Sequence, residues 1–403
     1  MNGKAKVLYI FHVSVIGGGS FCLLNIIKNL DRERFLPIVL LKKPGPLATE
    51  LSKLGATVYF EKRITTVLYN KSIFKISSIR QLIDVFISIP KIIDWYRKIN
   101  PDIIHLNTMM LYPYLHGASK LKIQTVLHMR EHWPKNEHQI QFKFARNIID
   151  KYTDMIVAIN QTSADILGLM DKTIVIHDYI SFEGRDETYN FESIFGKDYQ
   201  ELKIFSFFGG TNWQKGALQV IDTFVKHIKD TDIRLLVVGG GEKKIIYKGL
   251  KGILKKELAR FNYYRYNDKV RFIAQKDSRI IFVPGTYQIK SIIEQSSAVV
   301  SAFSIPHANL TMAEASVLGV PSIAANTPEA KEYSNNGNSA LLFEMNNKKD
   351  FIDKIRYFLD HTKLIKRKAE VGSDNMTKIF SVKANSVLLD RMYCDLLSGK
   401  KTN

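Results

Sequence analysis

The stretch SIPHANLTMAEASVLGVPSIAANTPEAKEYSNNGNSALLF, residues 304–343, decides the fold. A loop that contains a proline leads into a short helix, which is predicted to begin near Asn309. The apolar runs Val320–Ala324 and Ala340–Phe343 predict two strands separated by a polar turn. Strands that are apolar throughout, alternating with helices, are typical of a parallel sheet covered on both faces.

The helix start within this stretch is the first candidate site. A helix N-terminus presents free backbone N–H groups and a partial positive charge, so it can hold a phosphate group. Asn309 and Thr311 lie at this start, and Glu314 lies one turn further on, where its carboxylate can reach a pair of neighbouring hydroxyls. A phosphate together with a diol is what a nucleotide presents.

The same alternation of strands and helices extends over the rest of the chain. Expected helices are Phe21–Leu30, Leu47–Leu54, Ser77–Ile99, Ala217–His227, Lys349–His361 and Val382–Leu397. Expected strands are Val7–Val13, Pro37–Leu41, Val58–Phe60, Ile103–Leu106, Thr125–His128, Met155–Ile159, Ile204–Phe208, Arg234–Val238, Val270–Ile273 and Ala298–Ala302.

The chain has 403 residues, more than one hydrophobic core usually serves, so two α/β domains are expected. The pattern breaks in the polar and aromatic stretch before residue 201. We predict an N-terminal domain over residues 1–185, a linker over 186–200, and a C-terminal domain over 201–378. The helix in 379–403 is expected to cross back to the N-terminal domain. In doubly wound sheets ligands bind beyond the carboxyl ends of the strands, so two facing domains predict a site in the cleft between them.

Composition narrows the class of protein. The formal charge of +19 is spread over both halves, without the basic stripe or module typical of nucleic-acid binders, so no nucleic-acid partner is expected. Such a surface suits a polyphosphate substrate or anionic lipid, and equally a lysine-rich soluble protein. The two cysteines lie at opposite ends, which favours a reducing compartment and gives no metal framework. We expect a cytoplasmic protein without a signal peptide or membrane-spanning helix.

Two glycine-rich loops follow expected strands. Gly17-Gly18-Gly19-Ser20 joins the first strand to the first helix but lacks the spacing of a dinucleotide site, and it is compatible with a simple tight connection. The loop of residues 209–216, with Gly210 and Thr211, opens the second domain. Its Lys215 precedes a helix, where it is placed to meet a diphosphate as a point charge or to lie on the surface.

Polar residues also end the strand near His128. His128 is predicted to hydrogen-bond a sugar or phosphate, and Arg130 to clamp an anion or to pair with a carboxylate such as Glu131. The pair Asp230 and Asp232 resembles a metal-binding DxD motif, but it falls at a polar turn where solvated carboxylates are usual. The histidines between 128 and 138 lack the spacing of a zinc site, so no metal is expected.

Together these segments resemble the family-4 retaining glycosyltransferases with the GT-B fold. The closest correspondence is Glu314 to Ala324, EASVLGVPSIA, which is similar to the family pattern E-A-x-x-x-G-x-P-V-I-A. The resemblance implies an α/β fold of two facing Rossmann-like domains, each with a doubly wound parallel sheet, and an interdomain cleft. It implies that a sugar is transferred from a nucleotide-diphosphate-sugar with retention of configuration and without a metal or cofactor.

The resemblance also assigns roles to residues. Glu314 matches the glutamate that binds the nucleotide ribose, and the turn Asn309, Leu310, Thr311 matches the backbone amides that hold the distal phosphate. Lys215 matches the lysine that neutralises the leaving diphosphate, with Gly210 and Thr211 in the same donor-binding loop. His128 matches the histidine that touches the donor sugar. Gly18 and Gly19 match the loop beneath the diphosphate, and Arg130 is expected to assist there.

Two positions depart from the family pattern. Pro306 stands where the family has a first glutamate, and the adjacent His307 is the expected catalytic replacement near the donor sugar. Thr211 stands where the family has an arginine, so diphosphate binding would rest on Lys215, the helix start and Arg130.

The predicted function is a hexosyltransferase that uses a UDP- or GDP-type sugar and a glycan or lipid-linked acceptor in cell-envelope polysaccharide synthesis. The amphipathic segment Ile73–Arg97 either lies on the inner face of an anionic membrane or packs on the first sheet. Two alternatives remain open. A non-catalytic glycosyltransferase-like subunit would show neither transfer nor donor hydrolysis, and a sugar-nucleotide epimerase would need no acceptor.

Overall fold

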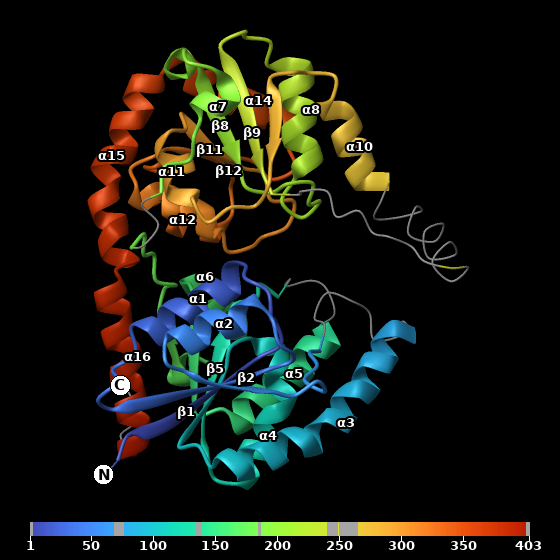
Figure 1. Ribbon diagram of the computed structural model, residues 1–403, viewed down its shortest axis with the longest axis vertical. Coiled ribbons are helices and arrows are strands. Elements are labelled where there is room, and N and C mark those ends of the chain that lie inside the picture. The colour runs from blue at the N-terminus through green and yellow to red at the C-terminus, as the bar shows by residue number, and fades with distance from the viewer. Residues whose placement is uncertain are drawn as a thin grey trace. The chain divides into compact units, whose positions relative to one another are not determined.

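The computed structural model describes residues 3–67, 76–133, 139–183, 187–239, 249 and 265–399. The chain divides into two compact units, one formed by residues 1–181 and 379–403 and the other by 182–378. Each unit contains one parallel sheet with helices on both faces (Figure 1). The sequence also contains a lysine-rich run, residues 243–256, whose composition predicts a solvated helix face; apart from Gly249 it lies outside the described residues.

The first unit is built on seven parallel strands in the order β3-β2-β1-β4-β5-β6-β7. The strands are β1 Ala5–Phe11, β2 Phe35–Leu41, β3 Thr57–Phe60, β4 Ile103–Leu106, β5 Gln124–Met129, β6 Met155–Ala158 and β7 Thr173–Val175. The helices are α1 Gly18–Lys28, α2 Pro46–Lys53, α3 Ile76–Ile99, α4 Leu115–Lys120, α5 Gln139–Tyr152, α6 Gln161–Leu167 and α16 Val382–Ser398, and η1 Met109–Tyr114 is a 3-10 helix.

Strand β1 shows why its sheet is covered on both sides. Val7, Tyr9 and Phe11 pack with α1, α2 and α16, whereas Leu8 and Ile10 pack with α3, α4 and α5. Successive side chains of a strand point to opposite faces, so an unbroken apolar run requires a helix layer on each face. The C-terminal helix α16 completes one of these layers with Leu389, Met392 and Tyr393.

The second unit has six parallel strands in the order β10-β9-β8-β11-β12-β13. They are β8 Lys203–Phe207, β9 Ile233–Val238, β10 Ile280–Val283, β11 Ala298–Ser301, β12 Ser322–Ala325 and β13 Ala340–Phe343. The helices are α7 Glu192–Phe195, α8 Ala217–His227, α10 Arg265–Ala274, α11 Ile289–Glu294, α12 Leu310–Val317, α13 Pro328–Glu332, α14 Lys348–Asp360 and α15 Thr362–Ile379. Residues 187–200 of the expected linker are folded onto this sheet through buried Phe191.

The expectation of a strand at Val270–Ile273 is wrong, because these residues lie in α10. The buried side chains there are Val270 and Ala274, four residues apart, whereas Phe272 between them is exposed. That spacing belongs to a helix, in which residues i and i+4 share a face. The strand of this region is β10, which follows α10 after a short turn.

Candidate functional site

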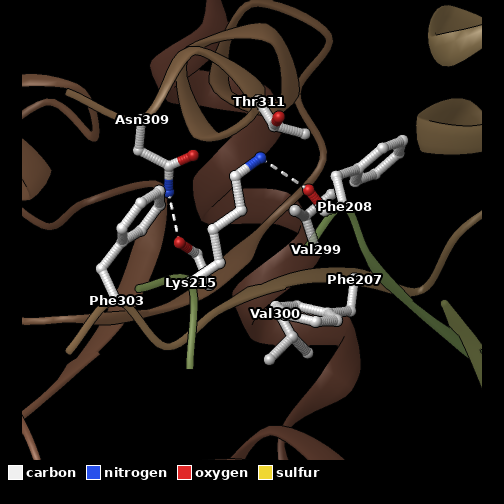
Figure 2. Close-up of a pocket in the computed structure, with 9 residues that line it drawn as sticks. Phe207, Phe208, Lys215, Val299, Val300, Phe303, Asn309 and Thr311 are labelled. Atoms are coloured by element: carbon white, nitrogen blue, oxygen red, sulfur yellow. Dashed lines mark hydrogen bonds between the residues drawn. The ribbon is translucent and has the colours of Figure 1, made fainter. Parts of the chain in front are cut away.

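In the second sheet the chain reverses its direction of winding between β8 and β11. It runs from β8 outward to β9 and β10, and then from β11 outward to β12 and β13 on the other side. Loops that leave two such strands diverge, and the space between them is where open α/β sheets bind ligands. A pocket lies there, lined by Phe207, Phe208, Lys215, Val299, Val300, Ser301, Phe303, Asn309 and Thr311 (Figure 2).

The loop after β8 is held against the end of β11 by a glycine. Gly216 has a φ of +76°, and a Cβ placed on it would lie 1.8 Å from the carbonyl oxygen of Ala302. Only glycine fits both requirements. This close approach carries the preceding residue, Lys215, into the pocket, where its ammonium donates a 2.9 Å hydrogen bond to the carbonyl oxygen of Phe208.

Lys215 is a largely buried cation in a pocket that has one acidic neighbour. Burial lowers the pKa of Lys215, because water no longer solvates the ammonium, and the carboxylate of Glu314 opposes this shift. Glu314 itself is only 4% exposed. The ammonium side of the pocket, where Figure 2 shows Lys215 reaching toward Thr311, is therefore suited to an anion.

The start of α12 forms the opposite wall. The side chain of Asn309 caps the helix, since its Oδ1 accepts from the amide of Met312 at 3.3 Å. Its Nδ2 donates to Ser301 Oγ at the end of β11, which fixes the helix start to the sheet. Both ends of the Asn309 amide are thus occupied, and its role is to orient the helix rather than to bind a ligand with its side chain.

The backbone amides behind this cap differ in whether they are paired. The amides of Met312 and Ala313 donate to the Asn309 carbonyl, whereas those of Leu310 and Thr311 have no partner among the residues that the structure describes. Free amides at a helix start on the same pocket as a lysine ammonium have the chemistry that suits an anion.

Three predicted residues of this unit, Gly210, Thr211 and His307, lie on the loops after β8 and β11 but do not line the pocket. Gly210, with a φ of +52°, and the buried Thr211 belong to the β8 loop. His307 is exposed, and its ring lies against Phe303, with 5.4 Å between the ring centroids. The catalytic role expected for His307 stays a prediction.

The first sheet has its own reversal point, between β1 and β4. The loop after β1 leads to Gly17–Gly19, where α1 begins at Gly18. None of these three glycines has a positive φ, so the backbone conformation does not require glycine there. A Cβ on Gly19 would lie 3.9 Å from Arg130 Cδ, which brings the glycine loop and the end of β5 together. A Cβ on Gly18 would meet nothing within 4 Å.

Arg130 is buried and is held by protein groups. Its Nη1 pairs with Asp178 Oδ1 at 2.5 Å, and its Nε donates to Asn107 Oδ1 at 3.3 Å. Glu131, considered above as a partner, instead accepts from the amide of Met109 at 3.0 Å and caps the 3-10 helix η1. The carboxylate partner of Arg130 is therefore Asp178, and anion binding by Arg130 stays a prediction.

His128, at the end of β5, is a buried histidine with one unpaired ring nitrogen among the described residues. It is 2% exposed, its Nδ1 lies 3.1 Å from His105 Nε2, and its Nε2 has no hydrogen-bond partner among the described residues. Burial, together with Arg130 and His105, holds the pKa of His128 well below its usual value, so the ring is neutral near pH 7.

Sequence reasoning did not find the residues that support His128. They are His105, Asn107, Asp178 and Tyr393. One signal was present: a histidine in the middle of the otherwise apolar strand β4 is a buried polar group, and such groups require a partner.

The sequence and the fold were compared with those of known proteins. Residues 203–361 match the family model described as glycosyl transferases group 1. No curated protein sequence matches the chain. Among solved structures, HepE of Anabaena in complex with UDP and glucose has a TM-score of 0.74 at 17% identity, covering 97% of this chain and 99% of HepE.

Two further structures share the architecture. A glycosyltransferase from Rickettsia africae has a TM-score of 0.73 at 18% identity, covering 98% of this chain and 99% of that chain. The lipopolysaccharide outer core galactosyltransferase WaaB has a TM-score of 0.58 at 15% identity, covering 95% and 99%. This chain has the GT-B fold. The predicted resemblance to glycosyltransferases is thereby confirmed, and its narrower assignment to family 4 stays a prediction.

Proposed function

We propose that this GT-B protein is a retaining glycosyltransferase that takes a hexose from a nucleotide-diphosphate-sugar of the UDP or GDP type. The observation that carries the proposal is the pocket at the β8–β11 reversal, where Lys215 lies across from the amides of Leu310 and Thr311, which have no partner in the described part of the chain. The diphosphate would lie between them, and the buried carboxylate of Glu314 would accept from the ribose hydroxyls. That HepE was crystallised with UDP and with UDP-glucose supports a UDP-type donor.

The chemistry needs fixed positive charge more than a strong base. When the bond from the anomeric carbon to the diphosphate breaks, positive charge develops on the sugar and negative charge on the departing phosphate. Preorganised donors aimed at that phosphate lower the barrier. The Lys215 ammonium and the helix start supply such donors without a metal ion. The acceptor oxygen then bonds to the anomeric carbon on the same face, and its proton passes to the departing phosphate.

The acceptor proposed is a glycan or a lipid-linked sugar of the cell envelope, met at the cytoplasmic face of an anionic membrane. Among the described residues, no helix is long and apolar enough to span a bilayer. Helix α3 buries Val85, Ile92 and Tyr96, and its opposite face exposes the apolar residues Ile79, Ile83, Phe86 and Ile87. Exposed Arg80 and Lys91 lie on the same helix, and the chain carries a net charge of +19, which suits anionic lipid.

Ligand binding and product analysis test this proposal. Melting curves with UDP, GDP and ADP and with their glucose and galactose forms should show stabilisation by one nucleotide series, because a ligand that binds only the folded state raises the melting temperature. Donor hydrolysis or transfer, followed by NMR of the anomeric proton, should show retained configuration.

The same measurements separate the alternatives. The absence of both nucleotide stabilisation and donor turnover would favour a non-catalytic subunit. Pro306 and Thr211 favour this alternative, because they stand where the family pattern has a glutamate and an arginine. Interconversion of two UDP-sugars without an acceptor would indicate an epimerase.

A further inference from the structure

Ser301, the last residue of β11, has a hydroxyl group that accepts one hydrogen bond and has a proton left to donate. Asn309 Nδ2 donates to Ser301 Oγ at 2.5 Å, and Figure 2 draws this bond from the Asn309 amide. The hydroxyl proton of Ser301 has no acceptor within the part of the chain that the structure describes. Ser301 lines the pocket, so an acceptor bound in the pocket is the remaining partner for this proton.

The orientation of the Asn309 amide sets the direction of this bond. Asn309 Oδ1 accepts from the amide of Met312 at 3.3 Å, at the start of α12. If the side chain were turned over, its NH₂ group would face that backbone N–H, and two donors would oppose each other. Nδ2 therefore points at Ser301. Because Nδ2 can only donate, the Ser301 oxygen accepts in this bond, and its own proton must be donated elsewhere.

The ammonium of Lys215 is held at the same end of β11. Val300 pairs with Phe207 in the parallel ladder of β8 and β11. The next residues, Ser301 and Phe208, are therefore neighbours across the two strands, which lie about 4.8 Å apart. Since the Lys215 ammonium lies 2.9 Å from the Phe208 carbonyl oxygen, the ammonium and the Ser301 hydroxyl belong to the same end of the pocket.

The polar groups at this end of the pocket offer protons to a ligand. Lys215 is the one charged side chain among the described residues that line the pocket, and Thr211, which stands where the family pattern has an arginine, does not line it. The amides of Leu310 and Thr311 are also donors without a partner in the described part of the chain. The Ser301 hydroxyl adds an uncharged donor. A phosphate, which has several acceptor oxygens, suits such a set.

We propose that Ser301 is a further binding residue of this pocket, and that its hydroxyl, oriented by Asn309, donates to a phosphate oxygen beside Lys215. That the phosphate belongs to a nucleotide-diphosphate-sugar rests on the proposed function, whereas the bond from Ser301 to a phosphate does not. A hydroxyl proton without an acceptor is costly in a residue that is only 6% exposed. A phosphate oxygen removes that cost when it binds, because a charged acceptor makes a strong hydrogen bond.

Titration calorimetry of the full-length protein with pyrophosphate and with UDP tests this bond. We expect Ser301→Ala to bind both about tenfold more weakly than the unaltered protein, because one hydrogen bond to a charged oxygen is lost. Ser316→Ala is the matched control. It removes a buried hydroxyl on α12 that contacts Ser339 Oγ at 3.1 Å and does not line the pocket, so both affinities should stay the same. Equal affinities of Ser301→Ala and the unaltered protein would overturn the proposal.

The two ligands separate this proposal from the proposed function. Pyrophosphate binding without binding of UDP or GDP would count against a nucleotide-sugar donor, and the pyrophosphate titration would still decide the role of Ser301. If only the nucleotides bind, the UDP titration decides it. Binding of neither pyrophosphate nor a nucleotide to the unaltered protein would contradict both proposals.

A double-mutant cycle distinguishes a direct bond from an effect transmitted through α12. Asn309→Ala removes the anchor of the helix start but leaves the Ser301 hydroxyl in the pocket. If that hydroxyl donates to the phosphate, adding Ser301→Ala to Asn309→Ala should again weaken pyrophosphate binding about tenfold. If Ser301 acted only by holding Asn309, the added substitution would have no effect, and the direct bond would be wrong.

The salt dependence of binding shows whether Lys215 is disturbed. A hydroxyl carries no charge, so Ser301→Ala should weaken pyrophosphate binding by the same factor at low and at high salt. Lys215→Ala should instead reduce the salt dependence itself, because salt screens interactions between charges. A reduced salt dependence in Ser301→Ala would mean that the substitution displaces the lysine, and it would contradict a direct bond.

If Ser301→Ala does not fold, Ser301→Cys serves instead. A thiol can still accept from Asn309 but is only a weak donor, so pyrophosphate binding should again weaken. Unchanged affinity of Ser301→Cys would equally overturn the proposal.

Discussion

The ammonium of Lys215 donates a 2.9 Å hydrogen bond to the carbonyl oxygen of Phe208, one residue beyond the strand that leads into its loop. The bond holds the lysine side chain across the pocket in the absence of a ligand. A cation already in place needs little reorganisation when negative charge appears beside it, which is the condition for effective electrostatic catalysis.

Replacing this lysine should abolish most turnover. We expect Lys215→Ala to lower kcat/KM by a factor of roughly 10²–10³, equivalent to about 3–4 kcal/mol of barrier, by analogy with the loss of one oxyanion donor. Stability should change little, since the variant also removes a buried charge. The matched control is Lys226→Ala on α8, the helix that follows the Lys215 loop, which deletes an exposed lysine paired with Asp222. Near-normal turnover of Lys215→Ala would rule out the assigned role.

Two capping asparagines in the second unit separate binding from stability. Asn309 caps α12 beside the pocket, and Asn347 caps α14 by accepting from the amide of Asp350 at 3.1 Å. Each alanine variant should lose about 1 kcal/mol of unfolding free energy. Only Asn309→Ala should also weaken nucleotide binding, because only its helix presents amides to the pocket. Equal nucleotide affinity of the two variants in calorimetry would count against the helix-start site.

Glycine substitutions test whether the Lys215 loop depends on contact with β11. Gly216→Ala places a Cβ 1.8 Å from the Ala302 carbonyl oxygen, whereas Gly168 has the same left-handed conformation, with a φ of +63°, and a Cβ there would meet its nearest neighbour, the Asp165 carbonyl oxygen, only at 3.9 Å. We expect Gly168→Ala to cost about 1 kcal/mol from backbone strain alone, and Gly216→Ala to cost more and to impair nucleotide binding. Urea unfolding and calorimetry measure both. If the two variants had the same unfolding free energy and the same nucleotide affinity, the close contact of the Lys215 loop with β11 would not matter for binding.

The buried histidines predict acid sensitivity. Burial lowers the pKa of His105 in the folded protein from 6.5 to about 3. Between about pH 6.5 and pH 3, His105 is therefore protonated in the unfolded chain and neutral in the folded protein. Stability from this group is complete above pH 6.5 and falls as the pH drops, by about 2 kcal/mol at pH 5. His12, with a pKa lowered to about 4, acts in the same direction.

Asp390 acts in the opposite direction. Burial raises the pKa of its carboxyl in the folded protein to about 6, so the folded protein binds this proton more tightly than the unfolded chain and is stabilised as the pH falls. Asp390 contributes equally to the unaltered protein and to a histidine variant, so the difference between their pH dependences does not contain its contribution. Urea unfolding at pH 7.5 and 5 should show a smaller loss for His105→Gln than for the unaltered protein, and an unchanged loss for exposed His116→Gln. An equal pH dependence in all three proteins would show that His105 does not titrate on unfolding.

The exposed face of α3 should mediate any membrane binding. Phe86 is 70% exposed on α3, and Phe272 is 62% exposed on α10 of the other unit. If α3 docks on lipid, Phe86→Ser should reduce flotation with vesicles that contain anionic lipid, and Phe272→Ser should not. Binding should weaken with salt, because screening reduces the attraction between basic residues and the lipid surface. Salt-independent binding, or none, would remove the membrane from the proposed function.

Much of the fold could be predicted from local sequence. Ile103–Leu106, Ala340–Phe343 and Ala217–His227 have the bounds expected for them. Unbroken apolar runs and helical spacing are properties of a few neighbouring residues, so they can be recognised before folding. The strand prediction for Val270–Ile273 was wrong because it also relied on a local pattern. A short apolar run within a longer helix is too short for its spacing to distinguish a helix from a strand.

The candidate donor pocket was also accessible from sequence, because Asn309, Thr311 and Glu314 lie on one helix start and Lys215 lies in one glycine loop. Their meeting follows from a general rule, that the loops after the two strands flanking a reversal point border one crevice. The closeness of Lys215 to Glu314 did not follow from spacing and needed the tertiary structure.

Sequence by itself thus determined the two parallel sheets and the residues at the start of α12, since both are written in local patterns. Only the tertiary structure decided which groups surround His128. His105 contacts both His128 and Tyr393, and His105 and Tyr393 are 288 residues apart along the chain. No local pattern encodes these contacts, because sheet order and the packing of α16 bring the side chains together.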